Sequence, residues 1–536
     1  MNPVTLNTPN ETEQSELNYR YQQERYPTYK SLKECKKRRP TGAKVAFIHP
    51  GPTIEGKKNS SWLYGDLETA GSMQPPQGIC SLAAILRENG YYPTLFDAEP
   101  LGLSADEIAE KAMADDPDYV GITSYTISIR VAAHIAGRVK EIAKQRGNKV
   151  VTIIGGPHIT FLPKPTMARY SEFDYGIPGE GEITIVELID ALEHNEPTEN
   201  IPNLVYMKDG EPFRSEKRMP LIDMDELPLP EWTSLPRLNK YYHPAGDNLH
   251  RLPSVAIITS RGCPGKCYFC NPRGLGAKFR RHSAGYIIRM MKHLQKQFGI
   301  RDIFIVDDMF VYDRENAMEL CRLMKADKEL DMTWSVFCRV DYVDAELLKE
   351  MRSARCWQVG YGLESGSEHI LKMINKQQSI KQMENAIKWA NDVGIVVRGM
   401  FMVGNFGETK ETLQQTLDFV KRNPIKDFHI TFFTPMPGTG SFVQWKNYGK
   451  WNVDTTEGST KSQHGVTFVP NDLTEDELVS FQKRIYRALL LKPSTFFYQM
   501  SKMFRPGNTG FVLRAGLGFL KYTIFKKGNS AAGASF

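Results

Sequence analysis

Hydrophobic and polar positions alternate regularly from residue 43 to residue 195. Short apolar runs of strand length are separated by stretches whose apolar residues recur at helical spacing, such as residues 78–90 and 130–147. The apolar runs are residues 44–50, 92–98, 118–125, 149–156 and 174–180. Five strands with helices between them predict a doubly wound parallel sheet as the N-terminal domain, residues 43–195, of an α/β protein.

The same alternation returns, with six repeats, between residues 251 and 445. Its apolar runs are residues 254–261, 302–308, 333–340, 357–364, 396–403 and 427–435. Helical patterns lie between them, for example at 314–326 and 409–423. Six βα units predict an incomplete six-fold (βα) barrel, in which ligands bind at the carboxyl ends of the strands.

Three further segments lack this alternation. Residues 1–42 are polar, and we expect this lead-in to be disordered. Residues 196–250 include the acidic, proline-rich stretch 219–232, which predicts an extended linker between the two domains. Residues 446–536 are aromatic and basic, and we expect a small helical C-terminal region there.

The composition is typical of a multidomain globular protein. The chain has 536 residues, of which 41% are hydrophobic and 24% are charged. It contains no run of about 20 uninterrupted apolar residues, so the sequence predicts no membrane-spanning helix. Its first residues lack the features of a signal peptide, and eight cysteines in so long a chain do not form a disulfide framework. We therefore expect a cytoplasmic protein.

The positive charge is concentrated at the C-terminal end. From Leu478 to Phe536 there are ten basic residues and no acidic residue, so in a chain of net charge +6 the remainder carries −4. Arg514 and Lys521 are seven residues apart and share one face of an apolar helical pattern. Residues 478–536 are therefore a candidate for peripheral contact with an anionic membrane surface. The alternative is a solvated basic face packed against the acidic remainder. No nucleic-acid-binding motif accompanies this charge, so we expect no nucleic-acid partner.

The strongest chemical signal is the segment RGCPGKCYFC, directly after the first strand of the second block. Cys263, Cys267 and Cys270 have the spacing C-x3-C-x2-C, and three thiolates in one loop can hold an iron–sulfur cluster. No fourth cysteine lies nearby, so one iron would keep an open coordination position. The alternatives are a zinc site and chance clustering, but zinc would require a fourth ligand, and the first histidine after the motif is His282.

This motif, with Phe269 in its aromatic position, resembles the radical S-adenosylmethionine (SAM) superfamily. The resemblance implies a 4Fe–4S cluster whose open iron binds SAM and cleaves it to a 5′-deoxyadenosyl radical. It also implies SAM contacts from Phe269 and from residues at successive strand ends, namely Asp308 near the methionine amino group, Arg339 at the carboxylate and Glu364 at the ribose. The alternatives are a helix cap for Asp308 and an ion pair with a neighbouring carboxylate for Arg339.

The first block, placed before such a barrel, resembles the Rossmann-like domain of cobalamin-binding radical SAM enzymes. The matching segments are residues 75–91, 153–160 and 179–182. Glycines at strand ends let a large flat ligand approach the backbone. The residues expected to bind cobalamin are Gln77, Thr123, Ser124, Gly155, Gly156, Gly179 and Gly181. The D-x-H-x-x-G motif of other cobalamin proteins is absent, so we expect no histidine on cobalt. The alternative is a flavodoxin-like sheet with nothing bound.

The overall layout resembles the branch that contains hopanoid methylases, the anaerobic magnesium-protoporphyrin ester cyclase and phosphonate methylases. It implies a cobalamin-dependent methyltransferase that uses methylcobalamin to methylate an unactivated carbon of a lipid-like or other small-molecule intermediate, tetrapyrroles included. It also implies an electron donor such as flavodoxin or ferredoxin. Cyclase or oxidoreductase chemistry without methyl transfer is the main alternative, and a non-catalytic cobalamin or redox sensor is a distant one.

Overall fold

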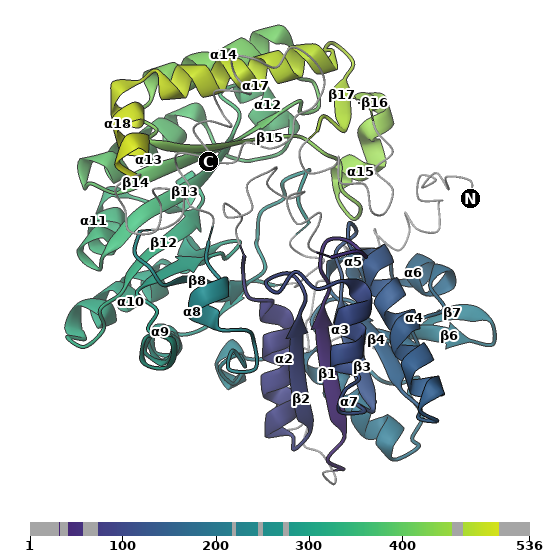
Figure 1. Cartoon of the computed structure of the whole chain (residues 1–536). Helices are drawn as coiled ribbons and strands as arrows, with labels where there is room; N and C mark the ends of the chain where they lie inside the picture. The colour runs from purple at the N-terminus through teal and green to yellow at the C-terminus, as the bar shows by residue number, and fades with distance from the viewer. Residues whose placement is uncertain are drawn as a thin grey trace.

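The computed structural model describes residues 32, 41–56, 73–216, 221–244, 250–271, 278–452 and 465–502. Two separate sheets organise this part of the chain, and the N-terminal one lies below the C-terminal one in the view of Figure 1. The predicted disordered lead-in, apart from residues 32, 41 and 42, and the basic helix expected around Arg514 and Lys521 lie outside the described residues.

The first sheet has the strand order β2-β1-β3-β4-β5-β6-β7. Strands β1 to β5 are parallel, as the sequence predicts, and β6 and β7 are antiparallel additions. The strands are β1 (Lys44–His49), β2 (Tyr92–Asp97), β3 (Tyr119–Thr123), β4 (Val151–Gly155), β5 (Tyr175–Gly176), β6 (Val205–Lys208) and β7 (Glu211–Arg214). The helices are α2 (Gln77–Glu88), α3 (Ala105–Ala112), α4 (Ile129–Gln145), α5 (Pro157–Phe161), α6 (Pro163–Arg169) and α7 (Glu182–Glu193).

Helices cover both faces of this sheet because successive strand residues point to opposite sides. In β1, Val45 and Phe47 belong to the core that contains α2 and α7. The intervening Ala46 and Ile48 belong to the core that contains α3 and α4. A strand buried on both faces reads as a continuous apolar run, which is the pattern that the sequence shows.

The segment expected to be a linker contributes to the first sheet. Residues 205–214 form the β6–β7 hairpin, so residues 196–250 are not wholly extended. Asp209 and Gly210 form its turn, with φ of 52° and 84°. A two-residue hairpin turn of type I′ requires positive φ at both positions, and Asp-Gly is a preferred pair for it. The Asp-Gly dipeptide is a local signal of a hairpin, and the prediction of a linker did not take it into account.

The second sheet has the order β15-β14-β13-β12-β11-β8, with every neighbouring pair parallel. It is curled and has β8 and β15 at its two edges, which confirms the predicted incomplete six-fold barrel. The strands are β8 (Ser254–Ile257), β11 (Asp302–Ile305), β12 (Thr333–Cys338), β13 (Cys356–Glu364), β14 (Val396–Val403) and β15 (Asp427–Phe432). The helices are α9 (Ala284–Phe298), α10 (Arg314–Ala326), α11 (Ala345–Ser353), α12 (Glu368–Met373), α13 (Ile380–Asp392) and α14 (Lys410–Arg422).

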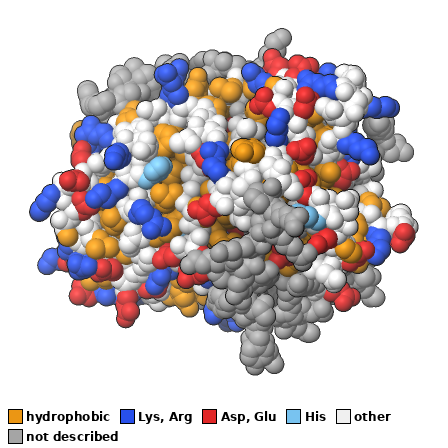
Figure 2. Space-filling model, turned by 90° about the horizontal axis from the view of Figure 1, so that it is seen from below, with side chains coloured by type: hydrophobic (Ala, Val, Ile, Leu, Met, Phe, Trp, Pro, Cys, Tyr) orange, Lys and Arg blue, Asp and Glu red, His pale blue; other side chains and the backbone are white. Residues whose placement is uncertain are grey.

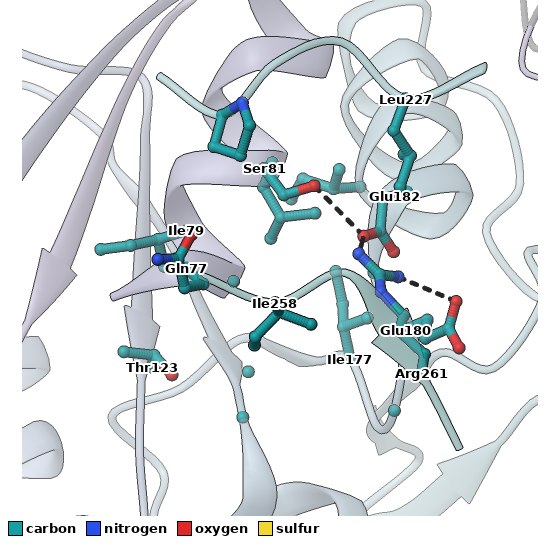
Figure 3. A pocket seen from close by; sticks show the side chains of 18 of the residues that line it. Gln77, Ile79, Ser81, Thr123, Ile177, Glu180, Glu182, Leu227, Ile258 and Arg261 are labelled. Carbon is teal, nitrogen blue, oxygen red and sulfur yellow. Dashed lines mark hydrogen bonds and ion pairs between the residues drawn. The ribbon is translucent and has the colours of Figure 1, made fainter. Parts of the chain in front are cut away.

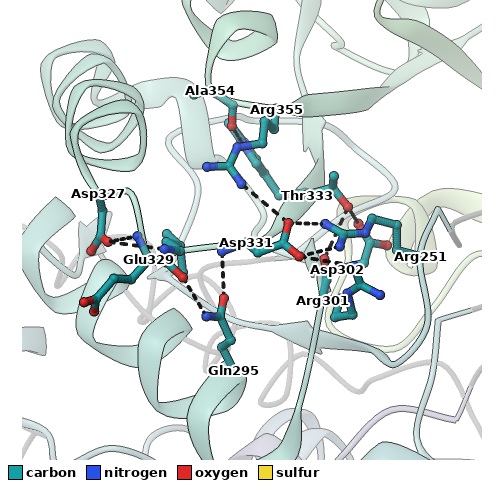
Figure 4. A network of polar contacts seen from close by, with 12 residues as sticks. Arg251, Gln295, Arg301, Asp302, Asp327, Glu329, Asp331, Thr333, Ala354 and Arg355 are labelled. Atoms are coloured by element: carbon teal, nitrogen blue, oxygen red, sulfur yellow. Dashed lines mark hydrogen bonds and ion pairs between the residues drawn. The ribbon is translucent and has the colours of Figure 1, made fainter.

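Polar contacts hold the amino ends of β11 and β12 together (Figure 4). Asp331, just before β12, pairs with Arg251 at 2.6 Å and with Arg301 at 3.2 Å. Asp302, the first residue of β11, is buried and accepts hydrogen bonds from Ser254 and Thr333. These contacts lie at the end of the barrel opposite to the one where parallel strands place ligands, so they support the fold rather than a site.

The C-terminal region is largely helical, as expected, but it also contains a two-stranded ribbon. The ribbon is β16 (Gly449–Trp451) with β17 (Phe468–Pro470), and the helices are α17 (Glu475–Leu490) and α18 (Pro493–Lys502). In Figure 1, α17 runs along α14 on the outside of the barrel. None of the helices that the structure describes is long and apolar enough to cross a membrane.

The remaining elements are short and lie in the connections. They are α8 (Leu238–Tyr241), β9 (Ser260–Arg261), β10 (Arg280–Arg281), α15 (Gly440–Gln444) and the 3-10 turns at Met224–Glu226, Phe310–Tyr312, Val340–Tyr342 and Trp445–Asn447. The β9–β10 ribbon flanks the cysteine loop, with Arg261 opposite Arg280.

Candidate active site

A cavity of about 400 Å³ lies between the two sheets (Figure 3). Thr123 and Gly155, at the carboxyl ends of β3 and β4, line it from the first sheet. Ile258 and Asp308, beyond the carboxyl ends of β8 and β11, line it from the second. The carboxyl ends of parallel strands are where both kinds of sheet bind ligands, so the cavity is shared by two ligand-binding edges.

Most residues expected to bind cobalamin gather in this cavity. The lining includes Gln77, Thr123, Gly155, Gly156, Gly179 and Gly181. Two glycines give the wall its shape, because a Cβ atom on Gly78 or Gly155 would meet no atom within 4 Å. A side chain at either position would therefore project into open space, and the glycines leave room for a large group against the backbone. This open glycine wall fits cobalamin, the group that the sequence predicts for the first domain.

Ser124, the seventh residue of that set, lies outside the lining. Its side chain is buried and donates a hydrogen bond to the Tyr125 carbonyl at 2.9 Å. Gly156 has a second requirement besides the cavity. With φ of 94° it packs so closely that a Cβ would lie 2.7 Å from Thr123 Oγ1. Close packing against the neighbouring strand therefore requires glycine at position 156, which the motif alone did not reveal.

A group of charged side chains forms the inner wall of the cavity. Arg261 donates to Glu180 at 3.0 Å and to Glu182 at 2.6 Å, which joins the barrel to the first domain. Burial opposes ionisation of Glu182, but the charge of Arg261 holds its pKa below the usual range. Ser81 from α2 also donates to Glu182, at 3.4 Å (Figure 3).

The three cysteines of the motif lie together in the loop after β9. Gly265 stands between two of the thiols, because a Cβ on it would lie 3.2 Å from Cys263 Sγ and 3.9 Å from Cys267 Sγ. Cys263 and Cys267 are partly accessible and Cys270 is exposed. Burial raises the pKa of the partly accessible Cys263 thiol.

Within the described ranges, no three His, Cys, Asp or Glu side chains are close enough together to hold one metal ion. A cubane cluster offers each thiolate a separate iron, so it needs thiols spread around a common space rather than converging on a point. Three accessible thiols in one short loop fit that donor set.

Arg339 lies directly over the cysteine loop. It pairs with Asp341 through two hydrogen bonds of 3.0 and 2.9 Å, as the alternative from the sequence had it. It also donates to the Lys376 carbonyl at 2.7 Å, and its Nη1 lies 3.6 Å from Cys267 Sγ. The guanidinium is thus held rigidly beside the thiols.

Lys376 connects the remaining residues of the predicted SAM site. Its ammonium group lies 2.6 Å from Glu364 Oε1 and 5.7 Å from the centre of the Phe269 ring. Glu364 ends β13 with φ of 59°, a left-handed conformation that non-glycine residues adopt rarely, and a register shift of the ladder accompanies it. The irregularity directs the Glu364 side chain toward Lys376.

The two aspartates after β11 differ in their surroundings. Asp307 is buried and accepts hydrogen bonds from the backbone and side chain of Thr259, and burial raises its pKa to about 6. Asp308 is exposed and lines the cavity. Asp307 therefore holds the segment after β8, and Asp308 is the one available to a ligand.

The sequence analysis missed five residues of this site. They are Glu180, Glu182, Arg261, Asp341 and Lys376. The first three stand inside motifs that drew attention only for their glycines and cysteines. Nothing in the spacing of Lys376 signals its role, because its partners come from three different segments of the chain.

Two family models match the chain in sequence order. The B12 binding domain model matches residues 65–189, and the Radical SAM superfamily model matches residues 257–420. A protein of Pyrococcus horikoshii described as an uncharacterized methyltransferase is 31% identical over 436 residues, covering 79% of this chain and 89% of the relative. The anaerobic magnesium-protoporphyrin IX monomethyl ester cyclase of Rubrivivax gelatinosus is 30% identical over 473 residues, covering 86% of this chain and 79% of the relative.

The fold agrees with that of a solved structure. The cobalamin-dependent S-adenosylmethionine radical enzyme OxsB superposes with a TM-score of 0.69 at 14% identity, covering 89% of this chain and 71% of that one. Both family models, and a relative 31% identical across most of both chains, agree with the cavity between the sheets and the adjacent cysteine loop. This chain therefore belongs to the cobalamin-binding radical SAM enzymes, whose cofactors are a 4Fe–4S cluster, SAM and cobalamin.

Proposed function

We propose that this enzyme transfers a methyl group to an unactivated carbon of a small-molecule substrate. The observation that carries the proposal is the glycine-walled cavity, which lies between the sheets and next to the three-cysteine loop. In a methyltransferase of this family, the cluster and SAM would supply the radical, and cobalamin would supply the methyl group. A shared cavity between the cysteine loop and the first sheet suits a reaction in which one substrate contacts both SAM and cobalamin.

The proposed roles follow the positions of the side chains. Cys263, Cys267 and Cys270 hold the cluster and leave one iron for SAM. On the SAM side, Arg339 is placed for the methionine carboxylate and Asp308 for the amino group, while Glu364 binds the ribose and Phe269 lies beside the adenosyl group. Lys376 is a positioning residue, because its ammonium group contacts both Glu364 and the Phe269 ring.

Cobalamin would rest against the first sheet. Gln77, Thr123, Gly155, Gly156, Gly179 and Gly181 supply its wall, and we propose Ser124 only as support for that wall through Tyr125. Gln77 also donates to the Ala256 carbonyl of β8 at 2.8 Å, so it ties the wall to the barrel.

The rim of the site supports a large apolar substrate, either lipid-like or a tetrapyrrole. Two exposed apolar side chains that follow strand ends line the cavity, namely Tyr125 after β3 and Ile258 after β8. Large apolar groups left in water around a ligand-binding edge are typical of surfaces that bind apolar partners. The Rubrivivax relative, named for its porphyrin ester, is consistent with such a substrate.

Cyclase chemistry is the second candidate, supported by the 30% identity to that cyclase. An anaerobic assay of the reconstituted protein with SAM, hydroxocobalamin and a strong reductant separates the two. Methyl transfer predicts S-adenosylhomocysteine together with 5′-deoxyadenosine. Formation of 5′-deoxyadenosine alone, with cobalamin bound, would contradict methyl transfer and favour the cyclase. The relatives are named as enzymes, which favours catalysis over a sensor.

Two partners complete the proposal. The first is an electron donor such as flavodoxin or ferredoxin, which radical SAM chemistry needs to reduce the cluster. The second is an anionic membrane surface, contacted through residues 478–536. The described part of this segment exposes Leu491 (82%), Phe497 (69%), Phe496 (48%) and Met500 on and before α18, in a stretch without acidic residues. Apolar side chains in a basic segment suit a surface that is both apolar and negative.

A further inference from the structure

Four charged side chains cross from one domain to the other beside the cavity. We call them the interdomain quartet: Arg261 and Arg280 from the β9–β10 ribbon, Glu180 from the loop between β5 and α7, and Glu182, the first residue of α7. Arg261 lies 3.0 Å from Glu180 and 2.6 Å from Glu182, and Arg280 pairs with Glu180 as well. Each arginine therefore belongs to the barrel and each glutamate to the first domain.

The quartet joins the two loops that carry the cofactor residues. Glu180 and Glu182 alternate in sequence with Gly179 and Gly181 on the cavity wall. Arg261 stands two residues before Cys263. The Arg261 side chain thus connects residues 179–182 directly to the start of the cysteine loop.

The surroundings make this link stiff. Glu182 and Arg280 are buried, and charge-assisted hydrogen bonds are strong where water is excluded. The planar guanidinium of Arg261 donates hydrogen bonds to two carboxylates, and these bonds fix its orientation. A lysine ammonium group on a flexible side chain would not be held in the same way.

Three members of the quartet also face the ligand space. Glu180, Glu182 and Arg261 line the cavity, so a group bound there contacts them directly (Figure 3). Glu182 Oε2, on the cavity wall, is buried and has no hydrogen-bond partner among the described residues. Buried polar atoms of this kind ordinarily find a partner, and the amide side chains of a corrin ring offer both donors and acceptors.

We propose that the interdomain quartet couples the two cofactor sites, so that cobalamin in the cavity fixes the position of the Cys263–Cys270 loop through Arg261. The four residues act as positioning residues. The inference rests on the proposed function in one respect, namely that cobalamin occupies this cavity.

Hydrogen–deuterium exchange of residues 262–271 tests the coupling. The cluster-reconstituted protein is compared with and without hydroxocobalamin, and an absorbance titration measures cobalamin binding separately. The variants are the double change Glu180→Gln with Glu182→Gln, and the milder Arg261→Lys, which keeps the charge but loses the fork. Arg281→Gln is the matched control, because Arg281 neighbours the quartet but pairs with Asp313 inside the barrel at 2.9 Å.

In the unsubstituted protein and in the control, cobalamin is expected to slow exchange of the cysteine loop at least severalfold. In Arg261→Lys, and in the double variant if it folds, cobalamin still binds but the protection is lost. Protection that persists in Arg261→Lys, or cobalamin binding without protection in the unsubstituted protein, overturns the coupling alone. Absence of cobalamin binding to the unsubstituted protein would overturn the proposed function together with it.

Discussion

At the residue scale, the site is organised by side chains that restrict one another. Arg339 is held by Asp341 and Lys376 beside Cys267, and Lys376 in turn holds Glu364. Each polar group near the thiols therefore has a fixed direction before any ligand arrives. Such preorganisation reduces the ordering that binding requires.

Cys267→Ala removes one of the three thiols. We expect the variant to lose iron and to form 5′-deoxyadenosine only at background level, because two thiolates do not hold the cluster. Cobalamin binding should be unchanged, since the cavity wall contains no cysteine. Cys321→Ala is the control, because Cys321 is buried in α10. Loss of cobalamin binding in Cys267→Ala would show that the two sites depend on each other more closely than proposed.

Gly155→Leu tests the cavity wall. A side chain there would point into open space, so the fold should tolerate it while the cavity shrinks. Overfilling a site opposes binding by about 1–3 kcal/mol, and we expect the dissociation constant of hydroxocobalamin to rise about tenfold or more in an absorbance titration. Gly285→Leu, at an exposed position in α9, should leave it unchanged. Equal affinity in the Gly155 variant would place cobalamin elsewhere.

At the element scale, α18 is locked to the barrel by its last residue. Lys502 is buried and lies 3.2 Å from Asp427, the first residue of β15. Gln499, one turn earlier, donates to the same oxygen at 3.3 Å, and Gln358 of β13 donates to the other at 2.9 Å. Two basic residues of the segment that is a candidate for membrane contact thus serve the fold, since Lys492 also bonds to backbone carbonyls of Val420 and Asn423.

Lys502→Met removes the ammonium group that contacts the buried Asp427 carboxylate. Removing one partner of a buried ion pair costs about 3–5 kcal/mol, so thermal unfolding of the variant should begin several degrees lower. Lys388→Met removes an exposed pair with Asp392 in α13, and we expect a change of about 0.5 kcal/mol or less. Equal melting temperatures of the two variants would mean that α18 is not a locked element.

Asp302→Asn addresses the pH dependence of the barrel (Figure 4). Burial raises the pKa of Asp302 to about 7, above the usual value of about 4 for an unfolded chain. The folded state then holds this proton more tightly, so the stability contributed by Asp302 is present below about pH 4 and is lost as the pH rises toward 7. In the variant, the fall in unfolding free energy between pH 5 and 7 should be smaller by about 2 kcal/mol. The unfolding free energies are measured by denaturant titration at pH 5 and pH 7. An equal fall between these pH values in the variant and in the unsubstituted protein would contradict the prediction.

At the scale of the whole molecule, charge is distributed unevenly. On the face shown in Figure 2, acidic and basic side chains are interspersed among apolar ones. The acid-free segment from Leu478 onward is different, and its described part carries the exposed apolar side chains of α18. A protein with one such end has an asymmetric surface, which is typical of peripheral membrane contact.

Phe496→Ser with Phe497→Ser tests this asymmetry. Each large apolar side chain contributes roughly 1.5–3 kcal/mol when buried, so co-sedimentation with vesicles that contain phosphatidylserine should fall at least about tenfold. Tyr92→Ser, an exposed aromatic position of the first sheet, should have no effect. Unchanged sedimentation of the double variant would contradict membrane contact through α18. A second test deletes residues 508–536, and unchanged sedimentation of that variant would contradict membrane contact through those residues.

The sequence by itself determined the two α/β domains and the nature of the cofactors. Strand and helix periodicity is a local property, and it located the five parallel strands of the first sheet and the six of the second. The spacing of Cys263, Cys267 and Cys270 is local as well, which is why the motif could be interpreted without a structure.

Tertiary structure decided what depends on residues distant in sequence. Only the packing of the domains brought Arg261 to Glu180 and Glu182, and only the curl of the barrel placed Lys376 between Glu364, Phe269 and Arg339. It also directed Ser124 away from the cavity and paired Lys502 with Asp427. Direction and pairing of side chains arise from long-range contacts, and those contacts carry no periodic signal along the chain.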